Sequence, residues 1–500
     1  MDRTSYRRLK SGTDVRGTAV GENYTLTDEA VADIVRAFVK WLSLKYGKTY
    51  FKIAVGHDSR ISAKRITECV KNAALESGAD IVYTGLSTTP SMFILLKKSD
   101  FGCDASIMIT ASHLPYDRNG LKFFTPEGGL DGKDIDEILT IAENKDFLCG
   151  KGNYTERSFM DDYSAILVET VRSSAGCKKP LAGKKIIVDA GNGAGGFFTE
   201  KVLIPLGADT EGSQFLQPDG YFPNHIPNPE DRGAIESLSK AVKSTGADLG
   251  IIFDTDVDRA GAVDRSGKEI NRNRLIALVS AILLKDKKGV IVTDSVTSDG
   301  LTSFIESLGG SHVRFKRGYK NVIDKCLEIN TSGTYSPLAM ETSGHAAFME
   351  NYFLDDGAYL ITKLLVSLSH LKEGESLTDL IKSLPEPAES DEVRITFGAK
   401  SEDFKSEGKK VIEELKAYAL SNGDMKLAAT NYEGARINFG KSNGDGWLLL
   451  RMSVHDPVMP INFASMQRGG NKKMARQIFY MLDKYPFLDV TALKNFINAK

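Results

Sequence analysis

The sequence feature that most constrains the fold is a strand-turn-helix pattern that occurs three times along the chain. Each time, a short apolar run ends in an aspartate and precedes an amphipathic segment; the runs are residues 52–58, 185–189 and 290–294, and the amphipathic segments are residues 62–77, 194–206 and 298–308. Each run predicts a buried strand and each amphipathic segment predicts a helix. Strands that alternate with helices form mostly parallel sheets covered on both faces, and the wide spacing of the patterns suits successive domains.

The C-terminal part of the chain has a different pattern. Strand-like runs at residues 392–397, 434–439 and 446–451 are combined with helix-like segments at residues 402–420 and 474–485, after a proline and glutamate cluster at residues 384–389. Because 500 residues exceed what one hydrophobic core usually supports, several domains are expected. We therefore predict an α/β protein of three tandem related α/β domains with mixed, mostly parallel sheets, followed by an α+β domain. The predicted domains are residues 1–161, 162–268, 269–386 and 387–500.

The charge balance argues against a polyanion-binding surface. The chain has 64 Lys and Arg against 66 Asp and Glu, a net charge of −2, so nucleic acid is not an expected partner. The cysteines are odd in number, scattered and without a CxxC pair, which is typical of reduced thiols in a cytoplasmic protein. No secretory signal and no apolar run of membrane-spanning length is visible, so we expect a cytoplasmic protein with no membrane partner.

Two segments carry candidate chemistry. Ser112 lies in the run Met-Ile-Thr-Ala-Ser-His-Leu-Pro at residues 108–115, and Asp254, Asp256 and Asp258 follow a predicted buried strand at residues 249–253. A tight turn after that strand would bring the three carboxylates to one cation, and Mg²⁺ prefers such oxygen ligands and completes its shell with phosphate. A phosphorylated serine needs such a cation to neutralise charge as its phosphoryl group moves.

The acidic run has three other interpretations. An EF-hand loop requires Gly and Glu where this chain has Arg259 and Arg265, which nearly excludes a calcium loop of that type. A haloacid dehalogenase phosphatase would have Thr or Val where this chain has Asp258. An ordinary acidic loop, solvated at a strand end, is the third alternative.

A glycine pattern at residues 191–196 resembles a nucleotide-binding fingerprint. Gly191, Gly193 and Gly196 match the spacing GxGxxG after a strand and before a helix. Asp189 and Asn192 would place a carboxylate and an amide close to an incoming pyrophosphate. We therefore favour a tight strand-to-helix turn that requires small residues over a dinucleotide site.

Four motifs in order along the chain resemble those of the α-D-phosphohexomutase family, which comprises phosphoglucomutases, phosphomannomutases and phosphoglucosamine mutases. The motifs are Ser-Gly-Thr-Asp-Val-Arg-Gly at residues 11–17, the serine segment at residues 110–122, the acidic run at residues 254–259 and Glu-Thr-Ser-Gly-His at residues 341–345. The resemblance covers nearly the full length. It implies a heart-shaped molecule in which each of four domains contributes one motif to a central cleft.

By this resemblance, Ser112 is the phosphorylated serine and binds Mg²⁺ together with Asp254, Asp256 and Asp258, while Lys122 is a general acid or base. The remaining implied roles are a place beside the transferring phosphoryl group for His113 and Arg259, support of the phosphoserine by Arg16, and substrate binding by Glu341, Ser343 and His345. Each residue also has an ordinary structural interpretation: Ser112 could cap a helix, Lys122 could be solvated, His113 and His345 could be satisfied polar groups, and Glu341 could pair with a nearby cation.

The phosphate-binding loop departs from the family pattern. The usual run Arg-x-Ser-Gly-Thr-Glu-Pro is here Arg-Met-Ser-Val-His-Asp-Pro at residues 451–457. Arg451 and Ser453 stay in register to hold the distal phosphate. Val454 resists a positive φ and stiffens the loop, and His455 could compensate for the missing threonine hydroxyl as a donor.

The resemblance implies an isomerase that interconverts hexose 1-phosphates and hexose 6-phosphates through a phosphoserine enzyme and a hexose 1,6-bisphosphate, which also serves as activator. Residues 217–229 resemble the segment of bifunctional phosphomannomutase/phosphoglucomutases, which favours glucose or mannose phosphates as substrates. The alternatives are a phosphoglucosamine mutase, a sugar-phosphate phosphatase and a non-catalytic sugar-phosphate binder. We expect a monomer or a homodimer.

Overall fold

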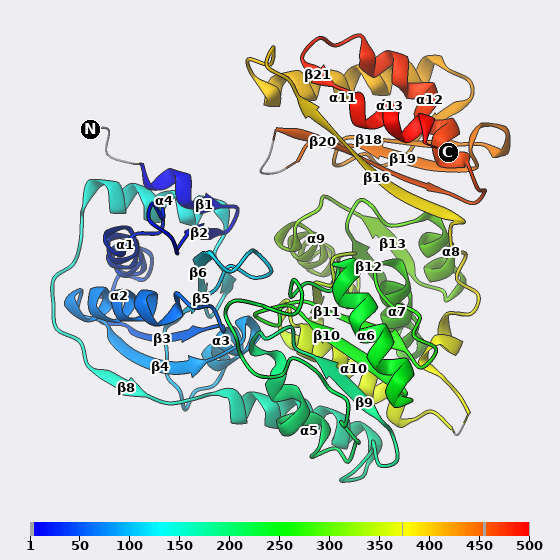
Figure 1. The fold of residues 1–500 in the computed structure, drawn as a ribbon. Coiled ribbons are helices and arrows are strands. Elements are labelled where there is room, and N and C mark those ends of the chain that lie inside the picture. The colour runs from blue at the N-terminus through cyan, green and yellow to red at the C-terminus, as the bar shows by residue number, and fades with distance from the viewer. Residues whose placement is uncertain (1–4, 373, 454–456, 500) are drawn as a thin grey trace. The chain divides into compact units, whose positions relative to one another are not determined.

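The fold was analysed in a computed structural model, which describes residues 5–372, 374–453 and 457–499 (Figure 1). The chain forms two compact units. The first contains Met1–Ile282 and Ser343–Ile381, and the second contains Leu283–Thr342 and Lys382–Lys500. Among the described residues, no helix combines the length and the apolar character that a membrane crossing requires.

The N-terminal part of the first unit is built on a large mixed sheet. Its strands have the order β1-β2-β6-β5-β3-β4-β8, with β7 paired to β6. Strand β3 is parallel to β4 and β5, whereas β6 is antiparallel to β2 and β5. The strands are β1 (Lys10–Ser11), β2 (Asp14–Thr18), β3 (Lys52–His57), β4 (Asp80–Leu86), β5 (Ala105–Ile109), β6 (Arg118–Thr125), β7 (Gly128–Gly129) and β8 (Tyr154–Glu156), and the helices are α1 (Asp28–Tyr46), α2 (Ala63–Glu76), α3 (Thr89–Ile94) and α4 (Gly132–Asn144).

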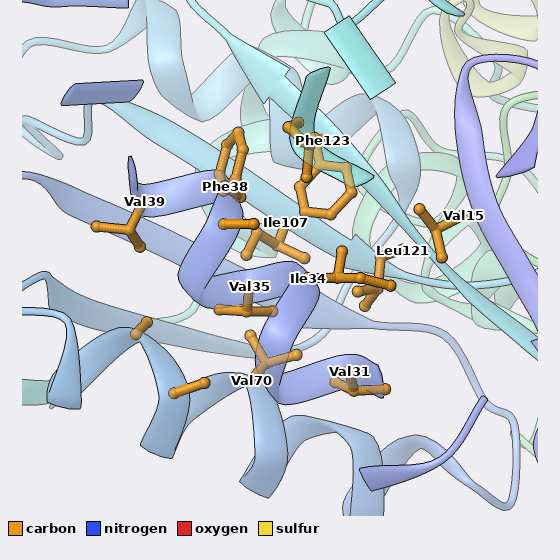
Figure 2. Close-up of a cluster of buried hydrophobic side chains, with 14 of the residues drawn as sticks. Val15, Val31, Ile34, Val35, Phe38, Val39, Val70, Ile107, Leu121 and Phe123 are labelled. Atoms are coloured by element: carbon orange, nitrogen blue, oxygen red, sulfur yellow. The ribbon is translucent and has the colours of Figure 1, made fainter. Parts of the chain in front are cut away.

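Helix α1 provides the centre of the hydrophobic core between this sheet and its helices (Figure 2). The helix begins after Thr27, whose side chain accepts the Ala30 amide, and ends at Gly47 with φ of +67°. Its buried face includes Phe38, whose ring centroid lies 4.6 Å from that of Phe123 on β6. Burial of each such ring contributes roughly 1.5–3 kcal/mol, so this packing fixes α1 against the sheet whose strand ends carry the loops.

A second sheet follows in the first unit. It has the order β11-β10-β9, with β9 (Ile186–Asp189) parallel to β10 (Leu249–Phe253) and β11 (Ala260–Asp264) antiparallel to β10. The helices of this part are α5 (Met160–Ala175), α6 (Arg232–Thr245) and α10 (Gly357–Ser369), and β15 (Ala346–Phe348) precedes α10. The segment predicted as a helix at residues 194–206 is helical from 194 to 203, but it is irregular, with a 3₁₀ turn at Ala194–Gly196 and a π-helical stretch at Thr199–Leu203.

The second unit contains a parallel strand group and an antiparallel sheet. Strand β12 (Val290–Thr293) lies between β13 (Ser311–Arg314) and β14 (Leu338–Met340) and is parallel to both. The C-terminal sheet has the order β17-β18-β19-β20-β16-β21 and its pairs are antiparallel. The sheet comprises β16 (Glu389–Phe397), β17 (Met425–Leu427), β18 (Ala435–Phe439), β19 (Gly446–Leu450), β20 (Val458–Ser465) and β21 (Leu488–Asp489); the helices are α8 (Asp299–Ser307), α9 (Tyr319–Thr331), α11 (Phe404–Ser421), α12 (Gly470–Asp483) and α13 (Thr491–Asn498), and α7 (Asn273–Asp286) connects the units. The predicted fold class, three α/β domains followed by an α+β domain, is confirmed.

The glycine turn after β9 has a structural role. Asp189 accepts hydrogen bonds from the Gly191 amide at 2.9 Å and from Gln214 Nε2 at 2.6 Å, and His225 Nε2 lies 2.9 Å from its Oδ2. A Cβ added to Gly193 would lie 2.7 Å from the Thr255 Cα, so only glycine lets this turn approach the loop after β10 so closely. The geometry supports the interpretation of the GxGxxG pattern as a tight turn.

The buried His225–Asp189 pair predicts that stability depends on pH. Burial lowers the pKa of His225, but the hydrogen bond and charge of Asp189 outweigh it and raise the pKa above the ordinary value. The charged pair therefore contributes its full stability below the unfolded-state pKa of about 6.5, and the contribution is lost as pH rises through the raised folded-state pKa. Each pKa unit of this increase adds about 1.4 kcal/mol to the free energy of unfolding at low pH.

We expect the thermal unfolding midpoint of the wild type to fall, relative to that of His225→Gln, as the pH rises from about 6.5 through the raised folded-state pKa of His225. Scanning calorimetry across this range measures the difference. The exposed His370 provides a control, because His370→Gln should follow the wild-type pH dependence. Parallel curves for the wild type and His225→Gln would contradict the prediction.

Candidate active site

The acidic residues lie on a tight turn between β10 and β11. The Val257 amide donates to the Asp254 carbonyl at 3.3 Å, and the Asp254 amide donates to the Arg259 carbonyl at 3.3 Å, so the turn is closed from both ends. Val257 has φ of +65°, which is strained for a β-branched residue. This reversal brings Asp254, Asp256 and Asp258 together, with one oxygen of each within 4.8 Å of the others.

The turn is held in place by neighbouring segments. The Ala194 amide donates to the Thr255 carbonyl at 2.8 Å, and the Gly357 amide donates to the Val257 carbonyl at 3.0 Å. From the first residue of α3, which follows β4 of the other sheet, the Thr89 amide donates to the Asp256 carbonyl at 2.9 Å and the Thr89 hydroxyl donates to the Asp256 carboxylate. The acidic turn is therefore attached to both sheets of the first unit.

The three carboxylates form a buried cluster of negative charge. Burial raises the pKa of Asp254 well above its ordinary value, and the neighbouring Asp258 and Asp256 raise it further. Asp256 Oδ1 and Asp258 Oδ1 are buried without a hydrogen-bond partner. Carboxylate oxygens left unpaired in such a cluster are the donor set of a hard divalent cation, so these residues fit a metal ion. The interpretation as a solvated acidic loop is wrong, because the three side chains are buried.

Lys122 projects from β6 into this cluster. Its Nζ lies 2.9 Å from Asp256 Oδ2 and 2.6 Å from Asp258 Oδ2. Burial lowers the pKa of Lys122, but the charges of Asp256 and Asp258 outweigh burial and raise it well above its ordinary value. The side chain is only 5% exposed, which excludes the interpretation of Lys122 as a solvated lysine.

Ser112 meets the acidic cluster directly. The residue follows β5, is buried and has φ of +53°. Its hydroxyl donates to Asp254 Oδ2 at 2.9 Å, and its amide donates to the Thr110 hydroxyl at 2.8 Å. No helix begins at Ser112, so the helix-cap interpretation is wrong. The structure brings together the hydroxyl and the three acids that the sequence places far apart.

The side chains of Arg16 and His113 lie near the serine and the acids. Arg16 on β2 forms an ion pair with Asp14 at 2.7 Å; burial lowers the pKa of Arg16, but the charge of Asp14 reverses this effect, with smaller contributions from the acidic turn. His113 Nδ1 lies 3.3 Å from the Ser112 hydroxyl. The positive charge of Arg259, together with burial, lowers the pKa of His113 to about 2, so its imidazole is neutral.

Arg259 and His345 form one polar chain with Asp355. Arg259 Nε donates to His345 Nε2 at 2.8 Å, and His345 Nδ1 lies 3.1 Å from Asp355 Oδ2. Because Nε2 of His345 accepts this hydrogen bond, the ring proton of His345 lies on Nδ1, which faces Asp355. Both histidines are thus hydrogen-bonded polar groups, as the ordinary interpretation predicted, and both also lie beside the acidic turn. Ser343, two residues before His345 in the sequence, is buried and belongs to the first unit.

The second unit collects a separate set of charged side chains. Glu341 follows β14 and accepts the Gly318 amide at 2.7 Å, and Arg317 Nε lies 3.6 Å from Asp294 Oδ2. Burial lowers the pKa of Arg451, and the neighbouring charge of Arg317 lowers it further. Two guanidinium groups that repel each other in this way are suited to an anion.

Other members of the loop at residues 451–457 are partly described. The Ser453 amide donates to the Val458 carbonyl at 2.9 Å, which continues the antiparallel pairing at the loop base. Val454 and His455 lie outside the described residues. Whether His455 contacts phosphate therefore stays a prediction.

Sequence reasoning missed several residues of these clusters, including Asp14, Thr89, Asp294, Arg317 and Gly318. Thr89 follows the capping threonine of a short helix with proline at its second position, a local signal of a fixed helix start. Gly318, with φ of +105°, precedes α9. In the sequence, a glycine directly before a helix was the signal that could have identified Gly318 as an amide donor to a ligand or a carboxylate.

Comparison with known proteins supports the family resemblance. The models of phosphoglucomutase/phosphomannomutase α/β/α domains I, II and III match residues 7–148, 161–267 and 271–388. A phosphoglucomutase of Neisseria meningitidis serogroup A is 31% identical over 479 residues, 95% of this chain and 96% of the relative. A phosphomannomutase/phosphoglucomutase of Pseudomonas putida is 32% identical over 457 residues, 90% of each chain.

A solved structure shows the same arrangement. The phosphoglucomutase/phosphomannomutase family protein of Burkholderia thailandensis superposes with a TM-score of 0.79 and 26% sequence identity, covering 95% of this chain and 97% of the other. The domain models together match well over half of the sequence, in the order that the four motifs predict. The chain therefore belongs to the phosphoglucomutase/phosphomannomutase family of α-D-phosphohexomutases, a family of isomerase-class phosphotransferases.

Proposed function

We propose that the protein interconverts hexose 1-phosphates and hexose 6-phosphates through a phosphorylated Ser112 and a hexose 1,6-bisphosphate. The observation that carries the proposal is the 2.9 Å hydrogen bond from the Ser112 hydroxyl to Asp254, within a cluster of three buried carboxylates and one buried ammonium. A serine in contact with a cation site and a proton carrier has the groups that phosphoryl transfer requires.

In the first half-reaction, the free 6-hydroxyl of a hexose 1-phosphate attacks the phosphorus on Ser112. The bond from phosphorus to the sugar oxygen forms, and the bond to Ser112 Oγ breaks. Lys122 donates a proton to the departing Ser112 oxygen and accepts the proton of the sugar hydroxyl, so the protons balance. In the second half, the 1-phosphate of the bisphosphate returns to Ser112 and hexose 6-phosphate is released.

We propose Mg²⁺ as the cation, held by Asp254, Asp256, Asp258 and a phosphate oxygen on Ser112, where it would supply positive charge to the transferring phosphoryl group. Arg259 supplies further positive charge, and His345 and Asp355 fix the direction of its guanidinium. Arg16 stabilises the phosphorylated serine. The neutral His113 donates a hydrogen bond to the transferring phosphoryl group without adding charge.

We propose that the remaining family residues bind the substrate. Glu341 and Ser343 hydrogen-bond sugar hydroxyls, and Arg451 and Ser453 hold the phosphate that is not being transferred. Both ring nitrogens of His345 face Arg259 and Asp355, so His345 acts on the substrate through Arg259 and not by direct contact. The proximity of Arg317 to Arg451, with its effect on the pKa of Arg451, supports an anion site there. His455 replaces the family threonine as a donor to that phosphate.

Glucose and mannose phosphates are the proposed substrates. Relatives that are about 30% identical over most of this chain have the names phosphoglucomutase and phosphomannomutase/phosphoglucomutase. A phosphoglucosamine mutase is the main alternative, and a phosphatase or a non-catalytic sugar-phosphate binder would also use such a site.

Replacing the proposed nucleophile should abolish turnover. We expect wild-type protein with Mg²⁺ and a trace of glucose 1,6-bisphosphate to convert glucose 1-phosphate to glucose 6-phosphate, and Ser112→Ala to be inactive because no oxygen remains to carry the phosphoryl group. A coupled assay for glucose 6-phosphate measures this. Ser244→Ala, at an exposed helical serine, is the control and should retain activity.

The same assay separates the alternatives. Full activity of Ser112→Ala would refute the assigned nucleophile, and release of inorganic phosphate equal to substrate loss would indicate a phosphatase. Tight binding without turnover would indicate a non-catalytic binder. Parallel measurements on mannose and glucosamine 1-phosphates rank the substrates.

Divalent cation binding should stabilise the protein through the acidic cluster. We expect Mg²⁺ to raise the thermal unfolding midpoint, since a ligand at about 100 times its Kd adds about 2.7 kcal/mol to the stability of the folded state. Asp256→Asn should greatly reduce this shift because it removes one ligand. Asp231→Asn, which keeps a good N-cap on α6, should leave the shift unchanged. Equal shifts in Asp256→Asn and the wild type would place the cation elsewhere.

Removing the proposed distal phosphate contact should weaken substrate binding. A hydrogen bond to a charged group is worth about 1.5–3 kcal/mol, so we expect Arg451→Ala to raise the KM for glucose 1-phosphate by about 10- to 150-fold. Initial rates over a range of substrate concentrations measure the change. Arg468→Ala, an exposed arginine in the same part of the chain, is the control. An unchanged KM in Arg451→Ala would remove this residue from the phosphate site.

A further inference from the structure

A buried ion pair lies directly behind the Ser112 loop, between β3 and α2. The side chains of Asp58 and Arg60 have no exposed surface, and Arg60 Nε lies 3.2 Å from Asp58 Oδ2. The Arg60 amide also donates to Asp58 Oδ1 at 2.9 Å. Neither residue belongs to the four motifs of the resemblance. A buried ion pair of this kind is costly to desolvate, so its location needs an explanation.

The two terminal nitrogens of the Arg60 guanidinium donate to the backbone of the serine loop. Its Nη1 donates to the carbonyls of Pro115 at 2.6 Å and Arg118 at 2.9 Å. Its Nη2 donates to the carbonyl of Leu114 at 2.6 Å and to that of Ser112 itself. One planar fork with fixed donor directions thus joins four carbonyls of one loop, which a lysine ammonium cannot reproduce.

Asp58 reaches the same loop by a second path. The Thr110 hydroxyl donates to Asp58 Oδ2 at 2.7 Å and accepts the Ser112 amide at 2.8 Å. The amide and the carbonyl of Ser112 are therefore both fixed by the ion pair, one through Thr110 and the other through Arg60. A non-glycine residue with φ of +53° costs about 1–3 kcal/mol and persists only where the surroundings fix it, and these two contacts act on either side of that dihedral angle.

A segment of the second sheet region covers the pair. Gly220 forms a parallel bridge with Arg60, and a Cβ on Gly220 would lie 2.3 Å from the Ile61 amide nitrogen. The ring of Phe222 lies 5.2 Å from Arg60 Cζ. Part of residues 217–229, the segment that suggested a substrate preference, therefore packs against the support of the serine loop.

We propose that Arg60, aligned by Asp58, is a positioning residue that holds Ser112 in the backbone conformation from which its oxygen meets the acidic turn. The proposal deepens the proposed function, because it rests on phosphoryl transfer at Ser112. Arg60 acts through four carbonyls and not on the substrate. Its loss should therefore affect the transfer step and leave substrate affinity nearly unchanged.

The test compares Arg60→Lys, Thr110→Val and Thr110→Ser with the wild type. We expect Arg60→Lys and Thr110→Val to lower kcat for glucose 1-phosphate by about tenfold or more, because a small misplacement of a reacting atom has effects of that size. KM should stay within about twofold. Thr110→Ser keeps the hydroxyl and should restore most of kcat. Arg65→Lys is the matched control, since Arg65 also donates to carbonyls, those of Ala19 and Leu26, in a different loop.

Phosphorylation of Ser112 gives a second readout. Intact-protein mass spectrometry after mixing with glucose 1,6-bisphosphate should show slower phosphorylation in Arg60→Lys and Thr110→Val than in Arg65→Lys. Rates are expressed per folded molecule, from thermal unfolding at the assay temperature. If Arg60→Lys does not fold, the Thr110→Val and Thr110→Ser pair decides the question.

Wild-type kcat and wild-type phosphorylation in folded Arg60→Lys and Thr110→Val would overturn the proposal. A loss of kcat that matches only the unfolded fraction would also overturn it. Failure of the proposed function has a different signature, because the wild type itself would then neither isomerise glucose 1-phosphate nor become phosphorylated at Ser112.

Discussion

The repulsion among three buried carboxylates is the constraint around which the first unit is organised. Two unit charges about 4 Å apart repel by about 4 kcal/mol at an effective dielectric constant of about 20. Asp254, Asp256 and Asp258 are this crowded and are shielded from water. The ammonium of Lys122, the hydroxyl of Ser112 and the hydroxyl of Thr89 all point at them, so each neighbouring element contributes a group that offsets the charge. A divalent cation, which these carboxylates fit, would complete the same compensation.

The site also depends on strained backbone. Ser112 and Val257 both have positive φ, one on the serine loop and the other on the acidic turn. Neither residue type adopts that conformation readily, and neither turn contains a glycine at the strained position. Surrounding hydrogen bonds fix these strained conformations: Thr110 and Arg60 bind the backbone of Ser112, and Gly357 binds that of Val257. Packing outside each turn therefore decides its conformation.

Local pattern in the sequence was sufficient to predict the sheets and the two central motifs. Apolar runs that end in aspartate gave correct strands at β3, β9 and β12, and the acidic run after β10 was correctly expected to converge. The segment at residues 194–206 was correctly expected to be helical, but its 3₁₀ and π geometry was not expected; Gly195 and Gly196 pack too closely against Phe253 and Leu216 to carry a side chain, and these contacts lie far away in the sequence. Short strands such as β17 and β21 lie below the length at which periodicity is visible.

Contacts between side chains and residues far away in the sequence could not be predicted. Thr89 is joined to Asp256, Arg60 to the serine loop, and Arg317 influences Arg451, all across long stretches of chain. Every residue type offers a backbone carbonyl as an acceptor, so the amino-acid sequence contains no signal of a hydrogen bond to a distant carbonyl. The positions of these residues became interpretable only once the sheets were in place.

The attachment of Thr89 to the acidic turn has a consequence for how the reaction cycle can proceed. Strand β4, which precedes Thr89, and strand β5, which precedes Ser112, belong to one sheet, so the acidic turn is joined to that sheet at two points. In the proposed cycle the bisphosphate must exchange its two ends before the second transfer. Two anchors from one sheet resist a movement of the serine away from the acids, so the proposed cycle assigns that exchange to a rotation of the sugar.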